Sequence, residues 1–202
     1  MTKLKLIYIF KNKEILFPIL LIIVAVISHL QWFNPFSTLT FGDWQFRPDA
    51  HVAQLLNSWN TWITFMDIGS TNVLVSGFPF RGILWSFIVN IGFSYDIATK
   101  LTLFIPVALG SFLSPYLLAR YWTKDAFIGF CAALFYGSTT YLLVIETAHI
   151  PIGFVYAMLP ILVLMLDVCL RRNKASSWVL LALLFSLGVY YEVRIMLSYP
   201  LF

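Results

Sequence analysis

The chain has 202 residues, of which 60% are hydrophobic and 11% are charged. Soluble domains carry about a quarter charged residues, so this composition excludes an ordinary soluble domain and indicates a membrane protein in contact with the lipid bilayer. Thirteen Lys and Arg against nine Asp and Glu give a net charge of +4, spread mostly over short segments between apolar runs. That distribution argues against nucleic acid as a partner. Cys131 and Cys169 lie inside apolar runs and indicate core packing rather than a disulfide framework or a zinc site.

Uncharged apolar intervals predict the membrane-spanning helices, because a span needs about 20 mostly apolar residues and rarely tolerates charge at its centre. We expect a single all-α, polytopic transmembrane domain over residues 1–202 with five spans, at about 15–33, 101–119, 126–145, 147–166 and 175–191. A further interval, 82–95, is shorter and favours an interfacial or re-entrant helix.

The basic residues predict the orientation of these spans, since Lys and Arg in short loops stay on the cytoplasmic side. An N-terminus inside places nine of the thirteen there, namely Lys3, Lys5, Lys11, Lys13, Arg120, Lys124, Arg171, Arg172 and Lys174. The other four, Arg47, Arg81, Lys100 and Arg194, then lie outside. Residues 27–30 offer no small-x-small cleavage site, so the basic start favours an uncleaved anchor over a signal peptide.

This topology leaves one long external segment, about 34–98, and only short loops elsewhere. We expect it to fold against the membrane and to hold the functional site. Apolar residues recur at helical spacing over 50–66, which predicts an interfacial helix with an apolar face toward the lipid and His51 on its polar face.

Asp43 is the first candidate site residue. It follows Gly42 directly after the first span, where a flexible glycine lets the carboxylate turn toward the membrane surface. On residue type alone, a simple Gly-Asp turn at the helix exit is the favoured explanation.

Glu146 and His149 form the second candidate pair, in the tight turn between the third and fourth spans. A carboxylate beside an imidazole could hold a metal or position a proton. The alternative is an ordinary polar loop, and two ligands without a third do not make a metal site.

Two local pairs carry structural predictions. Asp167 and Arg171 stand four residues apart and predict an ion pair on one helix face. Gly110 and Ser114 form a small-xxx-small pair, for which packing within the chain is favoured over association of two chains. Motifs of nucleotide-binding and hydrolytic enzymes are absent from the sequence.

The layout resembles the amino-terminal membrane module of GT-C-fold glycosyltransferases, in particular YfhO-like and arabinofuranosyltransferase-like bacterial membrane proteins. The similarity runs in order over about 40–175 and rests on the segments 42–44, 77–79, 117–120, 132–137, 149–151 and 156–160. Each motif is weak alone, and their order and spacing make the resemblance.

The resemblance implies transfer of a sugar from a polyprenyl-phosphate donor to an envelope glycan or lipid. The reaction would take place at the external face of a bacterial inner or plasma membrane. Asp43 would be the external catalytic base or the group that positions the acceptor, and Glu146 a second acidic residue. The substrate-binding residues would be Arg47, His51, His149 and Arg194. An arginine can hold a lipid phosphate, although ordinary headgroup contacts explain these two equally well. A divalent cation could also take part.

Family members continue through more spans, so we expect this chain to be the front part of a longer protein. Two alternatives remain open at this point: a non-catalytic transporter or flippase for a lipid-linked substrate, and an envelope scaffold. Polar residues inside the spans are few, which argues against ion-coupled transport.

Overall fold

The computed structural model describes residues 12–37, 39, 62–63, 70–71, 84, 87–139, 142 and 149–191. These residues are helical apart from turns and one short strand pair. In chain order the elements are α2 (Lys13–Ser28), α3 (Leu30–Phe33), β1 (Trp62–Ile63), β2 (Ser70–Thr71), α6 (Tyr95–Thr99), the π-helix η1 (Lys100–Phe104), α7 (Ile105–Thr123), α8 (Ala126–Gly137), α10 (Ile150–Arg172) and α11 (Ala175–Tyr191).

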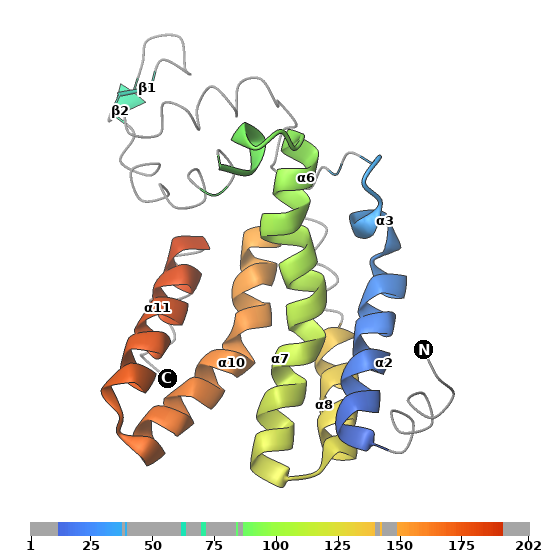
Figure 1. Cartoon of the computed structure of the whole chain (residues 1–202), viewed down its shortest axis with the longest axis vertical. Coiled ribbons are helices and arrows are strands. Elements are labelled where there is room, and N and C mark those ends of the chain that lie inside the picture. The colour runs from blue at the N-terminus through green and yellow to red at the C-terminus, as the bar shows by residue number, and fades with distance from the viewer. Residues whose placement is uncertain are drawn as a thin grey trace.

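The long helices form an antiparallel bundle in which successive helices run in alternating directions (Figure 1). Helix α7 packs against α2, α8 and α10, and α10 packs against α11. We call the end that holds α3 and α6 the Lys100 end. The opposite end, with the start of α2 and the α7–α8 and α10–α11 turns, is the Arg120 end.

Within the described residues, two helices are long and apolar enough to cross a membrane: Tyr95–Thr123, which joins α6, η1 and α7, and Ile150–Arg172. Two shorter apolar helices, Ala126–Gly137 and Ala175–Val189, accompany them. Each predicted span therefore contains a helix, and the all-α prediction is confirmed for the bundle.

The helices differ from the bounds of the predicted spans in three places. The helix expected to begin at 101 begins at Tyr95 instead, so Lys100 lies inside it. The fold can hold this charge because the ammonium is hydrogen-bonded, as described below. The fourth continues to Arg172, since the ion pair of its charged last turns is compatible with a helix. The third, expected over 126–145, is interrupted after Gly137 by a turn at Ser138, and Leu142 is again helical.

The helix predicted over 50–66 is wrong at Trp62 and Ile63. These two residues form β1 and pair antiparallel with Ser70 and Thr71 of β2. Aromatic and β-branched side chains favour strands, and the turn residues that follow Ile63 let the chain reverse and pair with itself. The rest of 50–66 lies outside the described residues.

Apolar side chains between the helices form two clusters. One joins α6, η1 and α10 at the Lys100 end through buried residues such as Tyr95, Phe104 and Ile150. The other joins α2, α7 and α8 around Leu21 and Phe112.

Close packing of α7 on α10 confirms the expected role of the small-residue pair. A Cβ on Gly110 would lie 3.2 Å from the Cβ of Ala157. Ser114 Oγ donates a hydrogen bond to Ala157 O at 2.5 Å. Both small residues thus face α10 within the same chain.

We expect Gly137→Ala to destabilise the fold by about 2 kcal/mol, in the range for overpacked cores. The new Cβ would lie 2.5 to 2.8 Å from ring atoms of Phe112, and that ring is only 2% exposed. Denaturant titration of the purified protein measures the loss. Phe112→Leu should make room for the methyl group, so an equal loss in the Phe112→Leu background would contradict this account.

Candidate functional site

The structure describes one of the six predicted site residues, His149. The other five lie outside the described residues: Asp43, Arg47, His51, Glu146 and Arg194.

His149 is exposed at the Lys100 end, directly before α10. Its carbonyl accepts hydrogen bonds from the N–H groups of Ile152 at 2.9 Å and Gly153 at 3.3 Å. The next residue, Ile150, is fully buried. The backbone of His149 is therefore fixed while its imidazole lies at the surface. Within the described part of the chain, no group of three His, Cys, Asp or Glu residues could hold a metal ion.

Lys100 is the most unusual charged residue of this end, because its residue is only 4% exposed. Its Nζ donates to Asn34 O at 2.5 Å, to Ser37 O, and to Ser37 Oγ at 3.1 Å. A lysine ammonium has three N–H donors, and here each has an acceptor. The buried cation thus joins the start of the second long helix to the chain that leaves α3.

The turn after α3 presents these acceptors to Lys100. Asn34 Oδ1 accepts the N–H of Phe36 at 3.0 Å, which is an Asx turn. Ser37 Oγ donates to Gln31 O at 2.8 Å and so fixes the end of the turn. The long segment that connects α3 to α6 begins near Ser37.

The π-helix η1 begins at Lys100 itself. A π-helical turn holds an extra residue and redirects the side chains around it, and such turns occur often at functional sites. Here it adjoins the contact between the helix and the Asn34–Ser37 turn.

A cluster of three aromatic rings lies at the same end of the fold. The rings of His29 and Trp32 lie 4.5 Å apart, and Trp32 meets Phe104 of η1 edge-on at 4.9 Å. His29 is buried at the break between α2 and α3, and its Nδ1 lies 3.0 Å from Ala25 O. That contact fits an Nδ1–H donor, since a carbonyl can only accept.

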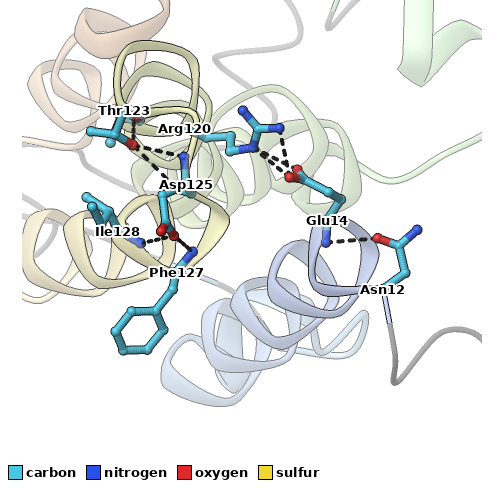
Figure 2. Close-up of polar contacts among 8 residues, drawn as sticks. Asn12, Glu14, Arg120, Thr123, Asp125, Phe127 and Ile128 are labelled. Atoms are coloured by element: carbon cyan, nitrogen blue, oxygen red, sulfur yellow. Dashed lines mark hydrogen bonds and ion pairs between the residues drawn. The ribbon is translucent and has the colours of Figure 1, made fainter.

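The Arg120 end carries an ion pair between helices that are distant in sequence (Figure 2). Arg120 Nε lies 2.8 Å from both carboxylate oxygens of Glu14, and Arg120 NH2 lies 2.7 Å from Oε1. The Arg120 side chain is 29% exposed and that of Glu14 is 50% exposed. Solvent weakens such a pair, so it aligns α2 with α7 more than it stabilises the fold.

The same view shows how α8 begins. The carboxylate of Asp125 accepts the N–H groups of Phe127 at 2.7 Å and Ile128 at 3.2 Å, which caps the helix. Lys124 ends α7 in the left-handed conformation, with φ of 59°. Two helices therefore meet in a very short turn.

The predicted local ion pair is confirmed. Arg171 Nε lies 2.9 and 2.8 Å from the two carboxylate oxygens of Asp167, one helical turn earlier.

Sequence reasoning missed Lys100 as a bonded residue and treated it as a charge of the external loop. Its acceptors stand more than sixty positions earlier in the chain, and no spacing rule links them. The signal available was indirect: a lone lysine at the border of a long apolar interval, where an unpaired charge is costly.

Comparison of the sequence with protein-family models and with curated proteins, and of the fold with solved structures, finds no match.

Proposed function

We propose that the protein is a membrane glycosyltransferase that moves a sugar from a polyprenyl-phosphate donor to an envelope glycan or lipid. The proposal rests on the ordered resemblance of residues 40–175 to GT-C-fold enzymes. In it, five helices cross the cell membrane, the N-terminus is cytoplasmic, and the Lys100 end faces outward.

The distribution of charge supports this orientation. Of the described basic residues, Lys100 alone lies at the Lys100 end, and its charge is buried and bonded. The others gather at the Arg120 end: Lys13, Arg120, Lys124, Arg171, Arg172 and Lys174. An excess of positive charge at one end is typical of the cytoplasmic side.

The break after α8 is compatible with a membrane-spanning role. Helix α8 has 12 residues and rises about 18 Å, so it does not cross a bilayer alone. Irregular backbone at membrane depth requires that its polar groups be bonded. At this break Thr139 Oγ1 accepts the N–H of Leu142 at 3.4 Å and lies 3.3 Å from Tyr136 O.

The observation that supports the location of the site is that Ser37 and His149 both lie at the Lys100 end of the bundle. Ser37 is fixed by Lys100, and His149 starts α10 beside the same apolar cluster. In the sequence Asp43 follows Ser37 by six residues and Glu146 precedes His149 by three. These short connections support both carboxylates acting at the Lys100 end. There a carboxylate would take the proton of the acceptor hydroxyl as the sugar is transferred.

An assay of sugar transfer tests the proposal. It uses membranes that contain the protein as it is encoded. The probes are polyprenyl-phosphate sugars labelled in the sugar, each tried with envelope lipid and glycan acceptors. We expect the label to move to an acceptor with one of these donors. Binding of a donor without transfer would overturn the enzyme proposal and favour a transporter or a scaffold.

A further inference from the structure

Helix α10 contains Pro160 in its interior, and Figure 1 shows the helix change direction part-way along its length. A proline has no N–H and its ring clashes with the preceding turn, so it bends a helix and leaves the carbonyl four residues earlier without its usual partner. In α10 that carbonyl belongs to Tyr156.

The neighbouring helix supplies the missing donor. Tyr136, near the end of α8, donates its hydroxyl to Tyr156 O at 2.8 Å. The two tyrosine rings stack with centroids 4.3 Å apart and planes 18° apart. A side chain of α8 thus replaces the main-chain bond that Pro160 removes.

A second neighbour bonds the next carbonyl. Ser114 Oγ of α7 donates to Ala157 O at 2.5 Å, and Gly110 allows the close approach of the two helices. Two consecutive carbonyls of α10 are therefore held by side chains of two different helices at the point where the helix bends.

We propose that α10 hinges at Pro160 and that the Tyr136 hydroxyl is the latch that holds the hinge closed. When the latch opens, the part of α10 after Pro160 tilts, together with α11, relative to α7 and α8. Most of α10 before the proline is buried, including Phe154 and Val155. After it Leu162 and Cys169 are buried, whereas Leu166 is 44% and Leu170 is 66% exposed. The part after Pro160 is thus less tightly held, as a movable segment requires.

A double-mutant cycle between Tyr136→Phe and Pro160→Ala tests the latch. Tyr136→Phe keeps the ring and removes only the hydroxyl, so amides 161–164 should exchange about ten-fold faster, as expected for one lost hydrogen bond. Pro160→Ala restores an N–H to Tyr156 O. In that background Tyr136→Phe should change the exchange less than about two-fold, because the latch is redundant.

Tyr156→Phe is the matched control. Its hydroxyl lies 3.2 Å from Thr139 Oγ1 and 3.5 Å from Tyr136 O, and so does not bond a carbonyl of α10. We expect wild-type exchange at 161–164. If Tyr156→Phe and Tyr136→Phe have equal effects, or if Tyr136→Phe acts equally with and without Pro160, the latch is wrong.

Spin labels measure the movement itself. Cys131 of α8 is exposed and takes one label, and Leu170→Cys takes the other, with the buried Cys169 replaced by Ala in every sample. The distance distribution should broaden in Tyr136→Phe and be narrower than wild type in Pro160→Ala. Should Tyr136→Phe fail to fold, Pro160→Ala decides alone, since an unchanged distribution there would overturn the hinge.

Discussion

Replacing Lys100 with Met should destabilise the folded protein by about 3 kcal/mol and loosen the turn that follows α3. Met keeps the apolar stem of the side chain but removes all three donors. Asn34 O and the two Ser37 oxygens then lose their bonds to the ammonium in a partly buried contact, and a hydrogen bond to a charged group contributes about 1.5–3 kcal/mol. Denaturant titration gives the free energy of unfolding, and hydrogen exchange at Phe36 and Ser37 reports the turn.

Lys174→Met is the matched control, because the same change is made at an exposed lysine of the α10–α11 turn. A surface substitution of this kind usually alters the free energy of unfolding by less than about 0.5 kcal/mol. If Lys100→Met is as mild as Lys174→Met, the ammonium does not hold the turn. Lys100 would then be available for an anionic ligand at this end.

The sequence predicts the helices well because the rule behind the prediction is local. An apolar interval of about 20 residues favours a helix through its own composition, although α8 ends at Gly137 within the interval 126–145. The Asp167–Arg171 pair is predictable for the same reason, since residues four apart share a helix face. The packing of Gly110 and Ser114 also follows, because small side chains allow two helices to approach closely.

The contacts that arrange the helices could not be predicted, since they join residues far apart in the chain. Glu14 and Arg120 are separated by 106 positions, and Lys100 and Asn34 by 66. The same limit explains the misplaced start of the second long helix. The sequence rule places the border of a helix at a charge, whereas the fold supplies acceptors that let the charge of Lys100 lie inside the helix. The candidate carboxylates belong to segments that the structure does not describe, so their roles remain predictions of the sequence.

If Asp43 is the external acid or base, Asp43→Asn in the protein as it is encoded should lower the rate of sugar transfer by at least about 100-fold. General acid–base catalysis contributes about 10²–10⁴ in rate, and an amide can neither accept nor return a proton at neutral pH. The side chain keeps nearly the same size, so insertion into the membrane should be unchanged. Transfer of label from a polyprenyl-phosphate sugar, with the protein level in the membrane measured in parallel, tests both expectations.

Asp67→Asn makes the same chemical change in the same segment between the first two predicted spans, at a residue to which no role is assigned. It should leave the rate within about two-fold of wild type, as expected of a substitution outside the site. Comparable losses in both variants would point to the net charge of the segment rather than to one carboxylate. Full activity of Asp43→Asn would remove Asp43 from the mechanism and make Glu146 the next carboxylate to replace.

Lys100→Met distinguishes the placement of Asp43 from its chemical role, because it removes the bonds that hold Ser37 but leaves Asp43 intact. Its transfer rate should fall less than that of Asp43→Asn and should recover at higher donor concentration.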